Sequence, residues 1–324
     1  MRKKLKDDLE KTLYILQWRT KEVDSFAKKI VRPEKGYECF EDITDLSALR
    51  VLTYTLGETE RVRESIEKEF DVDWSKTDDK GKQLKTSELG YRSINYIVRL
   101  PDSSSSPLEW AEFASLEAEI QVDTILSHVW SEIQHPIYKK EMTVPPELER
   151  RLYLVRGLLE VADLELQDFK EKTKELSSRI DDELRKKSPV RISTFALPHY
   201  LEHSELVQQL VHLASEIGFD LMSSLEQQLS IITDLADACL LVKIRTTDQL
   251  EDFLGRNLAQ ARNFLRELYV EIGKEKEAPW SVGEAYLVLF LLAAAFPESL
   301  NRDFFVKRGW SSTTVNLIKK ARLS

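Results

Sequence analysis

Cysteine, glycine and proline are all scarce in this chain of 324 residues, and each scarcity excludes a class of protein. The two cysteines, Cys39 and Cys239, lie far apart and outside any Cys-x-x-Cys motif, which argues against a zinc ribbon and a disulfide framework. Ten glycines and ten prolines, scattered along the chain, exclude collagen-like and low-complexity sequences and argue against an all-β fold. This use of cysteine fits a reducing cytoplasm.

The chain also lacks a long apolar run and an excess of basic residues. Its longest apolar run, 285–296, falls well short of the roughly 20 residues that span a bilayer, so we expect a buried helix there. The N-terminus is charged from its second residue and has no signal-peptide pattern, so we expect a cytoplasmic protein without a membrane partner. The net charge of −9 excludes an overall basic field, and a polyanion would have to meet a local basic patch.

What is present is ample material for a packed core. Hydrophobic residues make up 42% of the chain and charged residues 32%, which excludes wholesale disorder, and the length accommodates two domains. The charged stretch 172–190 has few apolar anchors, as expected of a domain junction. We therefore predict one domain over residues 1–189 and a second over residues 190–324.

The first predicted domain alternates between strand-like and helical segments. Short runs of β-branched and aromatic residues predict strands at 49–56, 91–100 and 116–122. Apolar residues at steps of three and four predict helices at 1–31, 58–70, 124–140 and 146–176, and the polar segment 73–88 is expected to be a loop. The expected fold class is α+β, with a mixed β-sheet flanked by helices and followed by an all-α domain.

The second predicted domain consists of amphipathic helices. Its helical segments are 205–218, 224–242, 247–268, 283–296 and 312–323. The last is basic and follows a Ser/Thr cap, so it is either the end of a helix-turn-helix or, as we favour, a terminal helix packed on its own domain. From its position alone, we expect a regulatory or oligomerisation role for this domain.

Side chains that bind phosphate gather near the N-terminus, where Arg19, Lys21, Ser25, Lys28 and Lys29 lie within eleven residues. Guanidinium and ammonium groups neutralise the charge of a nucleoside triphosphate, and a hydroxyl adds a directional donor. The alternative is a solvated helix face balanced by acidic neighbours, which is the better interpretation of this segment taken alone.

Carboxylates suited to magnesium stand beside the first predicted strand. Asp42 and Asp45 directly precede it, and Arg50 lies inside it. Mg²⁺ in nucleotide enzymes is held by one or two carboxylates together with substrate phosphates. The alternative is that Asp45 only caps a turn.

A second polar row is predicted in the strand at 116–122. The strand period of two places Glu117, Glu119 and Gln121 on one face and the apolar residues on the other. Such a row offers a second magnesium ligand and a base for a hydroxyl proton. An ordinary solvent face is the alternative.

A third polar group is expected on the helix at 124–140, where His128, Glu132 and His135 recur at i, i+4 and i+7. Their spacing resembles that of zinc ligands, but the HExxH register and a nearby fourth ligand are missing. We expect no structural metal here, and we expect these side chains to be hydrogen-bonded or to face a site.

In this order, the segments resemble the synthetase domain of the RelA/SpoT family of alarmone synthetases, over roughly residues 10–175. Five family elements are matched: Arg19, Lys21, Ser25 and Lys29; Asp45 to Val51; Gly90 to Asn95; Glu119 to Thr124; and Trp130, Glu132, His135, Tyr138 and Lys139. Three residues depart from the family pattern: Ala48 replaces a glycine, Asn95 a histidine and Asp123 an arginine. The replacements at Asn95 and Asp123 alter the acceptor side of the expected site.

The resemblance implies a nucleotidyltransferase-like core that transfers the β,γ-pyrophosphate of ATP to the 3′-hydroxyl of GDP or GTP, with Mg²⁺ as cofactor. By the same resemblance, Asp45 and Glu119 are the catalytic residues and the metal ligands. The ATP-binding residues would be Arg19, Lys21, Ser25, Lys29 and Arg50, and the acceptor-binding residues Tyr91, Ser93, Asn95, Gln121 and His135.

Other functions stay open. No His-Asp pair occurs among the five histidines, so we expect synthesis without the hydrolase activity of the long family members. Toxic relatives pyrophosphorylate the 3′ end of tRNA or make adenosine alarmones, and an inactive nucleotide-sensing module is a third hypothesis. The expected partners are ATP and GTP or GDP, with tRNA as an alternative and a second copy of the chain as a further candidate.

Overall fold

A computed structural model gives the structure of the chain and describes residues 14–30, 43–79, 93–101, 113, 116–139, 145–222, 229–274 and 281–321. The chain divides into two compact units, an N-terminal unit at Met1–Glu171 and a C-terminal unit at Lys172–Ser324. The division falls within α6 (Pro146–Arg185), a helix of 40 residues. The charged stretch from residue 172 is therefore helical as far as Arg185.

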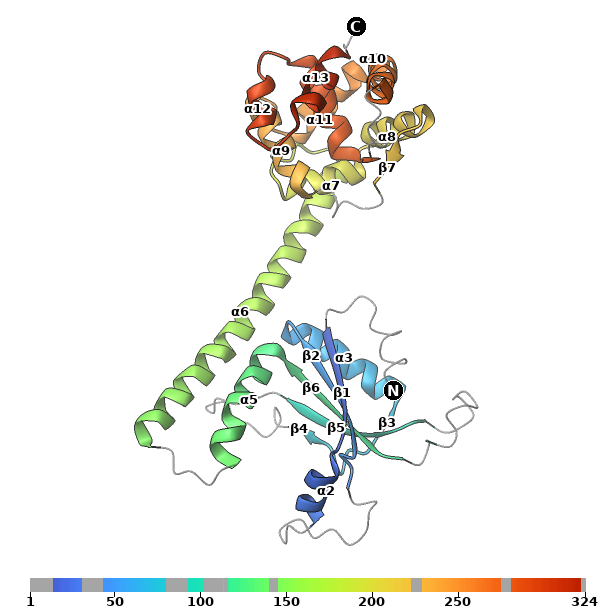
Figure 1. Cartoon of the computed structure of the whole chain (residues 1–324). Helices are drawn as coiled ribbons and strands as arrows, with labels where there is room; N and C mark the ends of the chain where they lie inside the picture. The colour runs from blue at the N-terminus through green and yellow to red at the C-terminus, as the bar shows by residue number, and fades with distance from the viewer. Residues whose placement is uncertain are drawn as a thin grey trace. The chain divides into compact units, whose positions relative to one another are not determined.

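The N-terminal unit is built on a mixed six-stranded sheet (Figure 1). Its strands are β1 (Tyr14–Thr20), β2 (Ser47–Thr53), β3 (Asp71–Val72), β4 (Asp78–Asp79), β5 (Ile94–Arg99) and β6 (Ala118–Thr124). The strand order is β1-β2-β6-β5-β3, and β4 pairs with β5 beside β3. The β2–β6 pair is parallel and the other pairs are antiparallel. This sheet confirms the predicted α+β fold class.

The helices beside the sheet are α2 (Val23–Ile30), α3 (Leu56–Glu69) and α5 (Ile125–Lys139). One face of the sheet packs against Val62 and Ile66 of α3 and forms the core of the unit. Along β6, buried residues alternate with half-buried ones from Ala118 to Thr124. The predicted alternation is therefore confirmed, and Glu119 and Gln121 lie on the face opposite α3.

The prediction of a helix throughout residues 1–31 is wrong for residues 14–20, which form β1. This segment contains the strand formers Tyr14, Ile15 and Trp18, and it pairs with β2 along its whole length, from Tyr14 opposite Thr53 to Thr20 opposite Ser47. Pairing along a neighbouring strand overrides a helical spacing that rests on a few leucines. The helical prediction is right for α2, and residues 1–13 and 31 lie outside the described residues.

The predicted loop at 73–88 also contains a strand. Asp78 and Asp79 form β4 and pair with Asn95 and Ile94 of β5. A strand of two residues is too short to show the alternation of apolar and polar residues by which strands are recognised. Residues 80–88 lie outside the described residues.

Polar contacts join α6 to the sheet and to the start of α3. The Thr124 hydroxyl donates to Asp163 Oδ2 at 2.7 Å, and the Gly57 amide donates to Gln167 Oε1 at 2.7 Å. Lys170 forms an ion pair with Glu58, which is buried. The Glu58 carboxylate also accepts the amide of Thr55 at 3.1 Å, so one carboxylate satisfies the start of α3 and holds α6.

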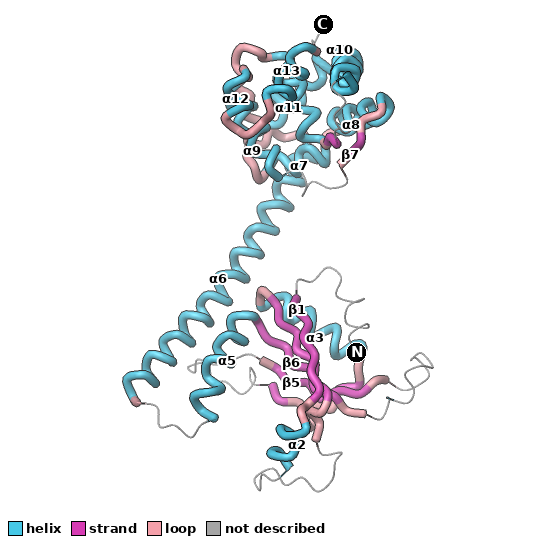
Figure 2. Tube along the Cα trace, in the orientation of Figure 1, coloured by secondary structure: helices cyan, strands magenta, loops and turns pink. Residues whose placement is uncertain are grey.

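The C-terminal unit is largely helical (Figure 2). Its helices are α7 (Ala196–His203), α8 (Glu205–Ile217), α9 (Leu229–Leu241), α10 (Thr247–Lys274), α11 (Glu284–Ala295), α12 (Arg302–Val306) and α13 (Ser312–Lys320), with short strands β7 (Asp220–Leu221) and β8 (Ser281–Val282). The predicted buried helix is α11, most of whose side chains lie in the core. Across the described ranges, no helix has both the length and the apolar character needed to cross a membrane.

Replacing Ile66 with alanine should destabilise the N-terminal unit by about 2–5 kcal/mol, because the side chain is fully buried between α3 and the sheet. The matched change Ile133→Ala, at a half-exposed position on α5, should cost far less. Urea unfolding followed by circular dichroism measures both. Equal losses in the two variants would contradict this description of the core.

Candidate functional site

Two rows of side chains cross the face of the sheet opposite α3. In the first row, Arg19 of β1 lies opposite Ala48 of β2, which lies opposite Glu119 of β6. The second row runs two residues further along the strands and consists of Gln17, Arg50, Gln121, Asn95 and Asp78. Because paired residues present their side chains on the same face, the sheet gathers polar groups from five strands on one surface.

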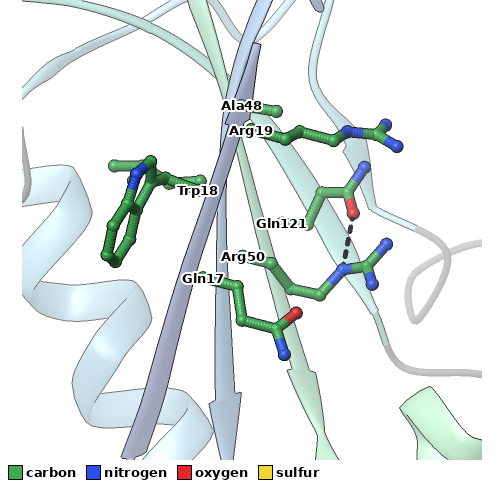
Figure 3. Close-up of a pocket in the computed structure, with 7 residues that line it drawn as sticks. Gln17, Trp18, Arg19, Ala48, Arg50 and Gln121 are labelled. Carbon is green, nitrogen blue, oxygen red and sulfur yellow. Dashed lines mark hydrogen bonds between the residues drawn. The ribbon is translucent and has the colours of Figure 1, made fainter. Parts of the chain in front are cut away.

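A pocket of about 100 Å³ opens on this face near β1 and β2. Figure 3 shows Arg19, Arg50 and Gln121 pointing to the same side of the sheet, while Trp18 points away from them. Ala48 lies in the same pocket, next to Arg19 in the first row. Its side chain is a single methyl group, so it takes up little of the pocket. The pocket is lined by Gln17, Trp18, Arg19, Ala48, Leu49, Arg50 and Gln121.

The Arg50 guanidinium is held by side chains of β6 and α5. Its Nε donates to Gln121 Oε1 at 3.1 Å, and Nη1 lies 3.5 Å from both ring nitrogens of His128. Nη1 also lies 3.4 Å from Glu132, whose side chain is 63% exposed, so this ion pair contributes little to the stability of the fold. Gln121 in turn donates from Nε2 to Glu119 Oε2 at 3.0 Å. Gln121 therefore connects the cation of one row to the carboxylate of the other.

A second cation–carboxylate pair lies at the edge where β2 and β6 begin. Lys21 follows β1, donates its amide to the Leu46 carbonyl at 2.9 Å and forms an ion pair with Asp45. Asp45 precedes β2, and Glu119 is the second residue of β6. Because these strands are parallel, both carboxylates lie at the same edge of the sheet.

The donor set at this edge fits a magnesium ion that also binds substrate phosphates. Such ions need one or two carboxylates from the protein, and Asp45 and Glu119 provide two. Within the described part of the chain, no cluster of three or more histidine, cysteine, aspartate or glutamate side chains could hold a metal without substrate.

The other predicted site residues are placed less completely. Asn95 lies in the second row, and Ser93 directly precedes β5 and is half-buried. Ser25 and Lys29 belong to α2 and His135 to α5, but their side chains, like all of Tyr91, lie outside the described residues. The structure therefore brings together Arg19, Arg50, Asn95, Glu119 and Gln121 on one face, and it places Lys21 and Asp45 at the edge where β2 and β6 begin.

Sequence reasoning missed Gln17 and did not include His128 or Glu132 among the site residues. Gln17 was hidden because its segment was predicted to be helical, and its place opposite Arg50 follows only from strand pairing. The spacing of His128 and Glu132 did place them on one helical face, and both lie close to Arg50. The i, i+4 spacing of His128 and Glu132, on a helix that directly follows a strand, was the signal that could have identified them as site residues.

Burial, and then the nearby Arg50 guanidinium, lowers the pKa of His128, while Glu132 opposes this shift. The imidazole is therefore neutral near pH 7, so it can accept a hydrogen bond from Arg50 or stack against it without repulsion.

Because the folded protein holds His128 at a pKa below its ordinary value of 6.5, this group favours folding above pH 6.5. The contribution is lost as the pH falls from 6.5 through the lowered pKa. His128→Gln should therefore make the free energy of unfolding depend less steeply on pH between about pH 5 and 6.5. Urea midpoints across this range measure the slope. An equally steep slope in the variant would contradict the assignment.

Three comparisons with known proteins found similar sequences and structures. Residues 18–143 match the family model described as "Region found in RelA / SpoT proteins". The chain is 28% identical over 140 residues to GTP pyrophosphokinase YwaC of Bacillus subtilis (strain 168), which is 41% of this chain and 62% of that protein. The match thus spans less than two thirds of this relative.

Solved structures resemble the chain over about half its length. Small alarmone synthetase 1 from Bacillus subtilis is 24% identical, with 50% of this chain and 81% of that chain covered and a TM-score of 0.40. A GTP pyrophosphokinase family protein from Streptococcus pneumoniae is 22% identical, with 54% and 86% covered and a TM-score of 0.43. The family match confirms the resemblance read from the motifs: residues 18–143 of this chain match a region found in RelA/SpoT proteins.

Proposed function

We propose that the N-terminal unit is a magnesium-dependent enzyme that transfers the β,γ-pyrophosphate of ATP to the 3′-hydroxyl of GDP or GTP, making (p)ppGpp. One observation carries the proposal: Arg19 and Arg50 share one face of the sheet with Glu119, and the Lys21–Asp45 ion pair lies at the edge where β2 and β6 begin. Cations placed beside a pair of carboxylates suit a polyphosphate–magnesium substrate. The similarity to a protein named GTP pyrophosphokinase supports the same reaction.

The donor nucleotide would bind at the pocket between Arg19 and Arg50. Guanidinium planes pair with phosphate oxygens and stack on flat rings, so both groups suit ATP. Gln121 and His128 hold Arg50 in place before substrate arrives, which lowers the entropy cost of ordering it on binding. Lys21 lies beside Asp45 and would exchange this partner for a phosphate. Ser25 and Lys29 belong to the same proposed donor site.

Asp45 and Glu119 would hold the magnesium ion. When bound, Mg²⁺ would neutralise negative charge on the transferring pyrophosphate. Glu119 would also take the proton of the 3′-hydroxyl, directly or through a water, as the hydroxyl oxygen bonds to the β-phosphorus of ATP and AMP departs. The Gln121 amide donates to Glu119 Oε2 and so orients this carboxylate. The rest of the rate enhancement would come from positioning and electrostatics.

The acceptor would approach from β5 and β4. Asn95 lies there between Gln121 and Asp78, so the described part of this row offers an amide and a carboxylate where the acceptor's 5′-phosphates would lie. Tyr91, Ser93 and His135 are the other proposed acceptor residues. Asn95 and Asp78 make this end of the row neutral and acidic. This favours a second candidate, an acceptor with less phosphate charge, such as an adenosine nucleotide or the 3′ end of tRNA.

Asp45→Asn and Glu119→Gln should each lower kcat for transfer of label from γ-³²P-ATP to GDP or GTP by at least about 100-fold. Each change keeps the size of the side chain and removes its charge. The matched control is Glu117→Gln, directly before β6, whose carboxylate pairs with Lys76 and Arg99. Near-normal transfer in either variant, or equal losses in all three, would contradict the proposed metal site.

Asn95→His should raise kcat/KM for GDP and GTP about tenfold relative to AMP, because an imidazolium can pair with the acceptor's phosphates. Parallel assays with GDP, GTP, AMP, ADP, ATP and bulk tRNA give the acceptor preference. Labelled tRNA or adenosine nucleotides, with no labelled GDP or GTP, would favour the second candidate over the first.

A further inference from the structure

β4 joins the sheet through few backbone contacts. It consists of Asp78 and Asp79, which pair with Asn95 and Ile94 of β5. Because a pairing of two residues is not stable by itself, side chains must hold this strand in place. The pleat sends its two side chains to opposite faces of the sheet. Asp78 lies in the polar row of the site beside Asn95, and Asp79 lies on the α3 face beside the buried Ile94.

Arg63 of α3 holds the side chain of Asp79. Its Nη2 donates to Asp79 Oδ2 at 3.0 Å, and the two side chains are only 18% and 10% exposed, so water and salt weaken this ion pair little. Its Nε donates to the hydroxyl of Tyr96 at 3.4 Å, and that hydroxyl donates to Glu67 at 2.7 Å. Tyr96 is fully buried in β5. One guanidinium group therefore connects α3 to both β4 and β5.

The turn before β4 is fixed by a separate set of bonds. The Asp73 amide donates to the Ile97 carbonyl at 2.8 Å, and the Ile97 amide donates to the Thr77 hydroxyl at 3.2 Å. The Thr77 hydroxyl donates to the Asp73 carbonyl at 2.8 Å. These bonds set where β4 begins, and the ion pair of Arg63 with Asp79 sets where it ends.

The position of β4 decides the geometry of the acceptor end of the site. Asp78 forms the end of the polar row, and the chain between β4 and β5 carries Tyr91 and Ser93, two of the proposed acceptor residues. Both ends of this connection meet at the paired residues Asp79 and Ile94. A shift of β4 would therefore move Asp78 and the start of the connection together. The donor pocket, on β1 and β2, lies at the other end of the strand order.

We propose that Arg63 is a positioning residue for the acceptor nucleotide: it holds Asp79 from the α3 face and so fixes β4 and the acceptor end of the site on the other face. Arg63 lies behind the sheet, so it acts through β4 and not by contact with a substrate. None of the five family elements matched in the sequence contains Arg63. This role rests on the proposed function, which assigns the acceptor to the end of the row at β4 and β5.

Arg63→Gln should raise KM for the acceptor about tenfold and leave kcat within about threefold, because only the acceptor end is displaced. The Kd of a non-hydrolysable ATP analogue should not change. Transfer of label from saturating γ-³²P-ATP to GDP, GTP, AMP or bulk tRNA, whichever the wild-type protein labels, measures KM and kcat. The matched control is Glu60→Gln, because Glu60 also pairs with Arg63 but lies on α3 itself and is 64% exposed. This control should behave as the wild-type protein does.

Asp79→Asn removes the other partner and tests the same ion pair if Arg63→Gln lowers the yield of folded protein. It should raise KM for the acceptor to a similar extent, and both changes together should raise it no further, because the two residues act through one contact. An unchanged KM in both single variants overturns the proposed role, and so does an equal loss of affinity for the ATP analogue, which indicates general damage to the fold. A wild-type protein that labels no acceptor overturns the proposed function as well, whereas labelling with an unchanged KM overturns this role alone.

Discussion

The parallel pairing of β2 with β6 in the middle of the sheet is the constraint on which the candidate site depends. It places Ala48 opposite Glu119 and Arg50 opposite Gln121, although these residues are about seventy positions apart in the chain. The pleat then sends Leu49, Val51, Ile120 and Val122 into the core against α3. A slip of one residue would exchange the two faces and bury the polar groups. The hydrophobic core therefore fixes the register, and the register builds the site.

The same constraint governs the two helices that follow β6. Because α5 begins directly at Ile125, it brings His128 to within 3.5 Å of Arg50 in the middle of β2. Thr124, the last residue of β6, binds the buried Asp163 of α6. Burial is the main cause of the raised pKa of this carboxyl group. The end of β6 thus positions His128 through α5 and holds α6 through Thr124.

Much of this arrangement could be predicted from the sequence, because it rests on local patterns. Alternation in β6 separated Glu119 and Gln121 from the core, and the order of motifs identified the RelA/SpoT region. Local patterns did not indicate that residues 14–20 form a strand, because β1 owes its conformation to pairing with β2. For the same reason, neither the place of Gln17 opposite Arg50 nor that of Asn95 opposite Asp78 could be read from spacing. The exposure of apolar side chains on α6 was also missed, since periodicity shows that a helix has an apolar side but not which side is covered.

We propose that the face built on the β2–β6 pair binds ATP between Arg19 and Arg50. Isothermal titration calorimetry of the full-length protein with a non-hydrolysable ATP analogue and Mg²⁺ tests it directly. We expect saturable binding, with a dissociation constant that rises at least about tenfold in Arg50→Gln, since a charge-assisted contact is lost. Equal affinity in the wild-type protein and the variant, or no binding to the wild-type protein at all, would contradict it.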